Sequence, residues 1–259
     1  QEGRVAVESV ATALSEETCL VSVMLANNEV GTVQDIAAIA AMLKKRGVPF
    51  HADAVQAVGH IPVDVKALGV TYLTASGHKF GGMKGTGFLW QRDGAELPPL
   101  ISGGGQERGR RAGTENTAGI AALGEALTES VERMPEDAVH SRNLVAYTLR
   151  MIQREIPEVR VHGADGAHLP GILNIGISGV RGESLVHLLD LKGICVSAAS
   201  ACRAGADAPS HVLRAMGYSE REAMEALRIS YSRENTQEEA QRVAEEIVCA
   251  VKKIRALGG

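Results

Sequence analysis

The sequence is poor in the features that mark several common classes of protein. Four cysteines occur in 259 residues, and none stand at the Cys-x-x-Cys spacing of zinc or thioredoxin-type sites, so we expect reduced thiols. Lys plus Arg number 27 against 31 Asp plus Glu, a net charge of −4 without the basic surplus of nucleic-acid-binding proteins. No apolar run approaches the roughly 18 residues of a membrane span. These absences argue against nucleic-acid and membrane partners.

The beginning of the chain matches no targeting signal. Its first residues lack the basic, apolar and small-residue order of a signal peptide, so we expect a cytoplasmic protein. The first residue is Gln1 rather than Met, directly ahead of strand-like and helix-like segments. This beginning indicates a processed or cut piece of something longer.

The composition that is present is ordinary for a globular protein, with 45% hydrophobic and 22% charged residues. At about 150 residues per domain, the length predicts one large domain or two ordinary ones, long enough to bury real cores without disulfides. Internal repeats and low-complexity tracts are not found.

The first half alternates short apolar runs with helical patterns, which is typical of an α/β fold with a mostly parallel sheet. Strands are predicted at residues 20–26, 48–52, 70–75 and 86–91. After Asp35, a capping residue, a helix is predicted with an apolar face formed by Ile36, Ile39, Ala40 and Leu43. Open α/β sheets bind ligands beyond the carboxyl ends of their strands, so polar residues just past these strands are candidates for a site.

The second half predicts a smaller α+β domain. Helices are expected at about 117–132 and 136–156, with Pro157 ending the second, and Thr236 with Glu239 predicts a capping box before a long last helix. We expect a large domain over residues 1–133 and a small C-terminal domain over 134–259. Further elements are expected as strands at 172–177 and 226–231 and as a helix at 183–191.

Lys79 closes the segment Ser76-Gly77-His78-Lys79 at a predicted strand end. A lysine whose pKa is lowered by burial and cationic neighbours can form a Schiff base with an aldehyde cofactor, and small polar neighbours can hold a phosphate. On this tetrapeptide alone, an ordinary surface lysine is the favoured interpretation. The surrounding sequence favours the cofactor-binding interpretation instead, because polar groups also follow two neighbouring strands.

Those groups are Asp53, Gln56 and Asn28. A carboxylate at Asp53 suits a protonated pyridine nitrogen and Gln56 can donate to a ring oxygen, although a helix-capping role for Asp53 is also open. Asn28 by itself is equally consistent with a turn. Three strand ends that carry such groups make a combination far more specific than its members.

Five motifs together resemble the cysteine desulfurases, NifS/IscS-like enzymes of the class V aminotransferase branch of fold-type I pyridoxal phosphate enzymes. The resemblance covers nearly the whole chain, in the right order. It implies that Lys79 carries the cofactor and that Thr114 reaches the phosphate of a partner subunit, so the site needs a homodimer. The motifs are residues 25–31, 51–56, 76–79, 103–108 and 111–114, and the implied cofactor-binding residues are Asn28, Asp53, Gln56, Ser76, Gly77, His78, Lys79 and Thr114.

The same resemblance implies roles in the second half. Cys202 lies in a small-residue loop and resembles the persulfide-forming nucleophile, whereas Arg228 and Asn28 match the residues that bind the substrate carboxylate. From the residues alone, Arg228 could equally form a structural ion pair. The other cysteines, Cys19, Cys195 and Cys249, are expected to be buried structural thiols, and a solvated surface stays open for Arg110 and Arg111.

Two other site classes are not supported. Gly103-Gly104-Gly105 lacks both Walker spacing and the strand, Gly-x-Gly-x-x-Gly, helix order of nucleotide loops. The histidines form no helical i, i+4 pair, so no metal site is predicted.

The sequence therefore predicts a cysteine desulfurase that uses L-cysteine, pyridoxal 5'-phosphate and a sulfur-acceptor protein, with a role in iron–sulfur cluster or other sulfur-containing biosynthesis. Family members carry an upstream ring-stacking histidine and a phosphate loop that this chain lacks, so we expect an N-terminal segment to be missing. The rivals are a selenocysteine lyase or another class V lyase, and a non-catalytic fragment that serves dimerisation or docking.

Overall fold

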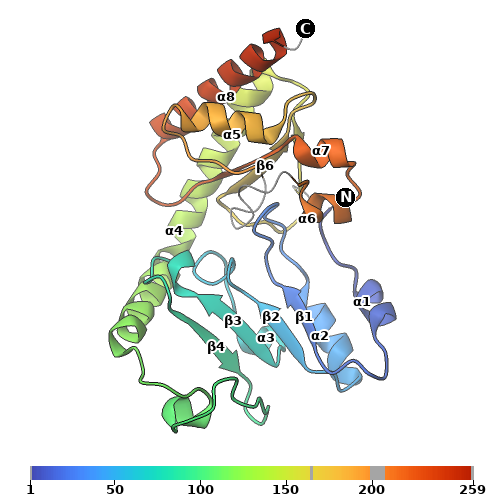
Figure 1. Ribbon diagram of the computed structural model, residues 1–259, viewed down its shortest axis with the longest axis vertical. Helices are drawn as coiled ribbons and strands as arrows, with labels where there is room; N and C mark the ends of the chain where they lie inside the picture. Colours follow the sequence, from blue (N-terminus) through green and yellow to red (C-terminus); the bar gives the residue numbers. More distant parts are fainter. Residues whose placement is uncertain (1, 164–165, 199–207, 258–259) are drawn as a thin grey trace. The chain divides into compact units, whose positions relative to one another are not determined.

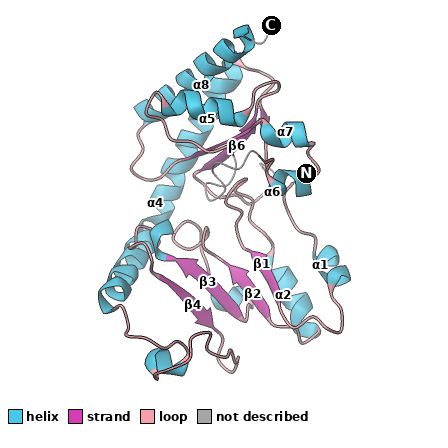
Figure 2. Cartoon of the chain, viewed as in Figure 1, coloured by secondary structure: helices cyan, strands magenta, loops and turns pink. Residues whose placement is uncertain are grey.

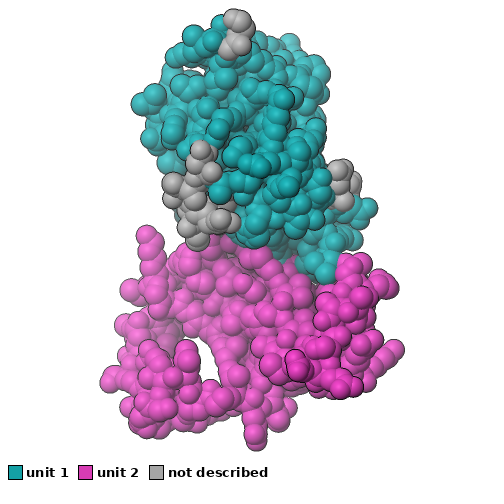
Figure 3. All heavy atoms as spheres, turned by 45° about the vertical axis from the view of Figure 1, so that its right-hand side comes forward, with its two compact units in different colours: residues 1–5, 26–34, 135–259 teal, residues 6–25, 35–134 magenta. Residues whose placement is uncertain are grey.

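The computed structural model describes residues 2–163, 166–198 and 208–257. The chain divides into two compact units, which Figure 3 colours separately. Unit 1 contains residues 1–5, 26–34 and 135–259, and unit 2 contains residues 6–25 and 35–134. The short segment 26–34 is therefore grouped with the C-terminal half of the sequence. The domain boundary expected between residues 133 and 134 stays a prediction.

Unit 2 is built on a four-stranded sheet whose first three strands are parallel and whose last strand is antiparallel (Figures 1 and 2). Ala52 and Leu73 are buried in the inner strands, as expected for apolar runs covered on both faces. The mostly parallel sheet predicted from the sequence is confirmed. In sheet order, the strands are β1 (Val21–Met24), β2 (Phe50–Asp53), β3 (Tyr72–Ser76) and β4 (Gly87–Gln91).

The helix predicted after Asp35 is α2 (Ile36–Lys45). The Asp35 carboxylate accepts a hydrogen bond from the Ala38 backbone N–H at 3.1 Å, which satisfies one of the free donors of the first turn. The apolar face predicted for this helix is buried. Other helical segments described in unit 2 are α1 (Val7–Ala13), α3 (Val65–Leu68) and the short 3₁₀ helices η1 (Gly77–Lys79) and η2 (Gln106–Gly109).

A single helix, α4 (Thr117–Glu155), replaces the two helices expected at 117–132 and 136–156. The expectation of two helices is wrong because Pro135 lies inside the helix without breaking it. An interior proline removes one backbone hydrogen bond and costs about 3 kcal/mol. Leu123 in unit 2 and Leu144 in unit 1 are buried on either side of it, and each burial contributes about 1.5–3 kcal/mol. Packing of both halves offsets the local cost.

Unit 1 combines an antiparallel sheet with helices, which confirms the α+β character expected of this half. Its core includes Ile175 and Leu227 from the sheet and Ile247 from the last helix. The predicted capping box is present, because Glu239 N–H donates to Thr236 Oγ1 and Thr236 N–H donates to Glu239 Oε2. The elements are β5 (Arg160–Val161), β6 (Ile172–Gly176), α5 (Gly182–Asp190), α6 (His211–Ala215), α7 (Glu220–Met224), β7 (Ala226–Ser230) and α8 (Gln237–Leu257).

The cysteines expected to be buried are not. Cys19, Cys195 and Cys249 are all exposed free thiols. Cys249 shows why the expectation is wrong: on α8 the neighbouring Ala250 and Val251 occupy the buried face, which leaves Cys249 on the opposite side. Within the described ranges, no helix combines the length and apolar character that crossing a membrane requires.

Candidate functional site

The carboxyl ends of β2 and β3 lie at the same edge of the unit 2 sheet, because the two strands are parallel and adjacent. Asp53 is the last residue of β2 and pairs in register with Thr74 of β3. The half-buried Asp53 carboxylate accepts a hydrogen bond from the Val55 backbone N–H at 2.9 Å. This bond shapes the turn that leads from Asp53 to Gln56, the two residues predicted to contact a cofactor ring.

His51 is a feature of this edge that the sequence analysis left without a role. Its Nδ1 lies 2.7 Å from Ser22 Oγ on β1, and its Nε2 lies 3.0 Å from Thr74 Oγ1 on β3. Burial lowers the pKa of His51 below its ordinary 6.5, while the Asp53 carboxylate opposes that shift. The available signal was the period-two spacing of His51 and Asp53, which places both on one face of the strand.

Ser76 is the last residue of β3, and the residues that follow it form the 3₁₀ turn η1 (Gly77–Lys79). Ser76 Oγ lies 2.8 Å from Nδ1 of His78, and Nε2 of His60 donates to the Lys79 carbonyl oxygen at 2.8 Å. The Lys79 side chain is half-buried, whereas His78 is exposed. The turn therefore places a hydroxyl, an imidazole and an amine within four residues of a strand end.

Gly77 is closely packed in this turn. A Cβ at position 77 would lie 2.6 Å from Thr86 Oγ1 and 2.7 Å from Leu123 Cδ1. The Gly77 N–H donates to the Thr86 carbonyl at 2.9 Å, and its own carbonyl accepts from Gly82 N–H at 2.8 Å. The backbone around η1 is thus fixed on both sides without a side chain in the way.

Thr114 lies in the exposed segment between β4 and α4. Gln106 Oε1 accepts from the Gly113 N–H at 3.3 Å, and the buried Ala112 donates its N–H to the Ile101 carbonyl at 3.2 Å. This loop is therefore tied by hydrogen bonds, with η2 inside it. Arg108, Arg110 and Arg111 are exposed, in line with the solvated-surface interpretation for the latter two.

Unit 1 brings together the two residues predicted to bind a substrate carboxylate. Arg228 on β7 donates from Nη1 to the Asn28 carbonyl oxygen at 2.9 Å and from Nη2 to Ser197 Oγ at 3.3 Å. Ser197 and Arg228 also form an antiparallel bridge through their backbones. The structure thus brings Asn28 and Arg228 into contact in unit 1, and in unit 2 it places Asp53 and the segment from Ser76 to Lys79 at the ends of adjacent parallel strands, with Gln56 three residues after Asp53. Cys202 lies outside the described residues.

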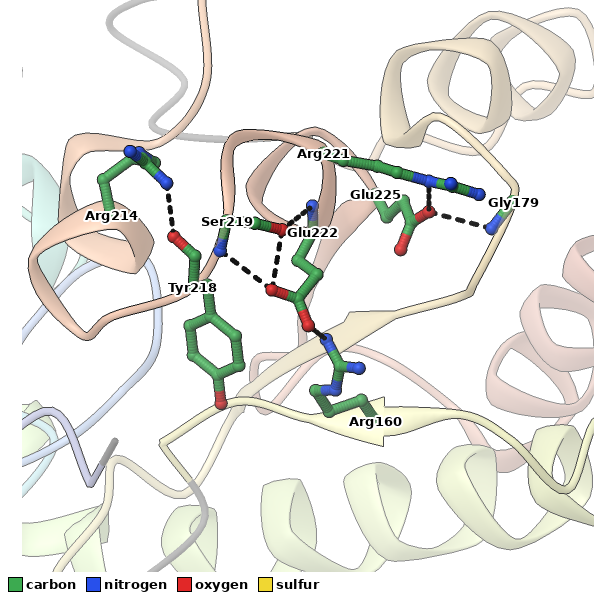
Figure 4. Close-up of polar contacts among 8 residues, drawn as sticks. All are labelled: Arg160, Gly179, Arg214, Tyr218, Ser219, Arg221, Glu222 and Glu225. Carbon is green, nitrogen blue, oxygen red and sulfur yellow. Dashed lines mark hydrogen bonds and ion pairs between the residues drawn. The ribbon is translucent and has the colours of Figure 1, made fainter.

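A second polar cluster in unit 1 surrounds α7 (Figure 4). Ser219 and Glu222 form a capping box, and Glu222 also pairs with Arg160 at 2.6 Å. The Glu225 carboxylate accepts from Gly179 N–H at 2.9 Å and from Arg221 Nε at 3.3 Å, beside a cleft of about 410 Å³. These charges are used to join α7 to the sheet and to the turn before α5.

The chain matches the model of the aminotransferase class-V family over residues 1–243, and it belongs to that family. It is similar to cysteine desulfurase IscS of Clostridium botulinum, at 43% identity over 259 residues that cover 99% of this chain and 65% of the relative. It is also similar to cysteine desulfurase IscS of Methanosarcina thermophila, at 41% identity over 98% of this chain and 62% of the relative. A solved NifS-like protein from Rickettsia africae shares the fold at a TM-score of 0.86 and 35% identity, over 98% of this chain and 68% of that chain.

These similarities confirm the fold-type I architecture expected from the sequence. The chain spans about 65% of the length of the first of these relatives. The family depends on pyridoxal phosphate, and the residues present in unit 2 fit that group. Asp53 offers a carboxylate, Lys79 an amine and Ser76 with His78 a hydroxyl–imidazole pair at one sheet edge, around a turn that is closely packed at Gly77.

Proposed function

We propose that this protein is a pyridoxal phosphate-dependent cysteine desulfurase. It converts L-cysteine to L-alanine and transfers the sulfur to one of its own cysteines, for iron–sulfur cluster or other sulfur-containing biosynthesis. The observation that carries the proposal is the convergence of Asp53 and the Ser76 to Lys79 turn at one edge of the unit 2 sheet. The similarity to proteins named cysteine desulfurase supports this choice of reaction.

Several residues of unit 2 bind different parts of the cofactor. Lys79 binds it covalently through its amine, Asp53 accepts a hydrogen bond from the pyridine nitrogen, and Gln56 donates to the ring oxygen. When bound, the cofactor supplies an electron sink for the substrate carbon. The donors to its phosphate are Ser76, Gly77, His78 and, from a second copy of the chain, Thr114.

Unit 1 supplies the substrate side. The Arg228 guanidinium binds the carboxylate of L-cysteine with help from Asn28, a role suited to its planar pair of donors. The Cys202 thiolate attacks the substrate sulfur, and the bond from that sulfur to the substrate carbon breaks. The carbon keeps the electron pair and takes up a proton to give alanine, while the sulfur remains on Cys202 as a persulfide.

The partners follow from this assignment. A phosphate contact from Thr114 of a second copy makes the active form a homodimer, and the Cys202 persulfide passes to a sulfur-acceptor protein such as a scaffold or sulfur carrier. The net charge of −4 supports a protein with no nucleic-acid partner. We place the protein in the cytoplasm.

The rival proposals make different predictions. A selenocysteine lyase on the same scaffold turns over L-selenocysteine far better than L-cysteine, so a comparison of the two substrates separates them, and Cys202 favours cysteine. A docking or dimerisation module retains no cofactor at all.

The test is a peptide mass map of the chain after incubation with pyridoxal phosphate and reduction with borohydride. We expect a pyridoxyl group on Lys79 and none on the corresponding peptide of Lys79→Ala. Lys84→Ala is the matched control, since Lys84 is an exposed lysine in the same glycine-rich stretch, and it should label as the unaltered chain does. Equal labelling of Lys79 and Lys84 contradicts the assignment of Lys79, and no labelling favours the docking module.

A further inference from the structure

The peptide group between Asn28 and Glu29 is held at both ends. Its carbonyl, on Asn28, accepts from Arg228 Nη1 at 2.9 Å, and its N–H, on Glu29, donates to Asn27 Oδ1 at 2.8 Å. Asn27 Oδ1 also accepts from the Val30 N–H at 3.0 Å, which closes a turn. The orientation of the carbonyl that Arg228 contacts is therefore set by the turn around Glu29.

Glu29 fixes that turn to the rest of unit 1 through its side chain. It is only 1% exposed, and its Oε2 accepts a hydrogen bond from Ser210 Oγ at 2.5 Å. Ser210 is itself buried and caps α6 by accepting from Leu213 N–H at 3.2 Å. One carboxyl group thus ties the Asn28 turn to a helix start 181 residues further along the chain.

The backbone of Glu29 is fixed as well. Its carbonyl accepts from Asn174 Nδ2 at 2.9 Å, and Asn174 Oδ1 lies 2.7 Å from His162 Nδ1. Asn174 and His162 are both buried. Side chain, N–H and carbonyl of Glu29 are each engaged, whereas a turn of this size needs only its Asn27 bonds to close.

A buried carboxyl group is a costly way to stabilise a turn, because it loses its hydration and well-packed apolar residues often replace such groups without loss of stability. Its directional bond to Ser210 instead defines one position for the 28–29 peptide. We propose that Glu29 is a positioning residue, which orients the Asn28 carbonyl and through it the Arg228 guanidinium that receives the substrate carboxylate. This inference rests on the proposed function, since Arg228 acquires a substrate only there.

The first test uses the cofactor-free chain and needs no activity. Hydrogen exchange at the buried Arg228 Nε–H and at the Glu29 amide is measured by NMR for the unaltered chain, Glu29→Leu and Glu29→Gln. Glutamine keeps an oxygen that can accept from Ser210, and leucine does not. We expect at least tenfold faster exchange at both positions in Glu29→Leu, and rates within twofold of the unaltered chain in Glu29→Gln.

Amides of the β6–β7 ladder serve as the internal reference, because a general loss of stability would accelerate them too. Unchanged exchange at Arg228 Nε–H in Glu29→Leu, or acceleration equal to that of the ladder, overturns the proposal. Should Glu29→Leu fail to fold, the same measurement on Ser210→Ala decides, since it removes the same bond from the other side.

The second test is kinetic and uses the cofactor-loaded protein with L-cysteine. We expect Glu29→Leu to raise KM at least tenfold with kcat within twofold, the pattern of lost substrate binding. Glu225→Leu is the control, because Glu225 is another buried carboxylate of unit 1 that contacts Gly179 and Arg221 instead. A KM change in Glu225→Leu equal to that in Glu29→Leu counts against positioning.

The two tests separate the two proposals. If the unaltered protein leaves L-cysteine unchanged, the proposed function fails while the exchange rates still decide whether Glu29 orients Arg228. If turnover is normal and Glu29→Leu leaves both exchange and KM unchanged, the function stands and the positioning role is wrong.

Discussion

The two units hold their candidate residues in opposite ways. In unit 2 the Asp53 carboxylate and the Ser76 hydroxyl are held by local bonds: Asp53 accepts from Val55, and Ser76 contacts His78, each two residues away. In unit 1 the bonds span most of the chain, with Asn28 and Arg228 separated by 200 residues. The proposed cofactor side therefore depends on short turns that follow two adjacent strands, whereas the proposed substrate side depends on contacts between distant parts of the sequence within unit 1.

Replacement of Arg228 by lysine should have the largest effect on the proposed substrate side in unit 1. Lysine keeps the charge but loses the planar pair of donors, and a hydrogen bond to a charged group contributes about 1.5–3 kcal/mol, so kcat/KM for L-cysteine should fall about 10- to 100-fold. Labelling of Lys79 by the cofactor should persist, because that side is local. Arg214→Lys, an exposed arginine that donates to the Tyr218 carbonyl, is the control and should stay within twofold. Steady-state kinetics measure both, and equal losses would remove the special role of Arg228.

Glycine-to-alanine substitutions compare the packing of the two units through their effect on the free energy of unfolding. A Cβ on Gly182 would collide with the backbone carbonyl of Ala226, which cannot rotate away, and we expect Gly182→Ala to lower the free energy of unfolding by about 3 kcal/mol. At Gly77 the obstructing atoms are the ends of the Thr86 and Leu123 side chains, so Gly77→Ala should cost only about 1 kcal/mol.

Gly124 is the matched control for both glycine variants. It lies in α4 with open space around it, and Gly124→Ala should raise stability by up to about 1 kcal/mol. Urea unfolding measures all three variants. A larger loss at Gly77 than at Gly182 would show that the turn of unit 2 is the more rigid of the two.

The smallest expected effect is a pH dependence that originates in unit 1. Burial lowers the pKa of His162 below 6.5, with Arg160 acting in the same direction and Asn174 and Glu222 opposing. Well above pH 6.5 the imidazole is neutral in both the folded and the unfolded state, so it adds no slope. Below that value the unfolded chain takes up a proton that the folded chain resists, and stability falls until the lowered pKa of the folded state is reached.

Unfolding in urea between pH 7.5 and 5 measures this slope, with pH values chosen about one unit apart around the ordinary histidine pKa. His162→Gln should flatten the slope more than His51→Gln, because His51 in unit 2 is only half-buried and Asp53 opposes its shift. Equal flattening by the two variants would place the acid sensitivity in both units alike.

Much of the architecture was predictable because it depends on near neighbours. Asp35 predicted the start of α2, and Thr236 with Glu239 predicted the start of α8, since capping bonds join residues three positions apart. The single helix α4 was not predictable, because the penalty of Pro135 is local while the packing that offsets it comes from the tertiary structure. The exposure of Cys249 was missed although the sequence carries a signal for it: the apolar spacing of Ala244, Ile247 and Val251 already places position 249 on the opposite face of α8.

The sequence by itself determined the strand ends, the turn motifs and the family, because these depend on the order and spacing of residues along the chain. Only the tertiary structure decided that the segment 26–34 joins unit 1 and that Glu29 meets Ser210 in its interior. In the sequence, nothing distinguishes Glu29 from a glutamate on the protein surface. Its partner and its burial come from chain segments brought together by the core, and local sequence carries no signal for contacts at such separations.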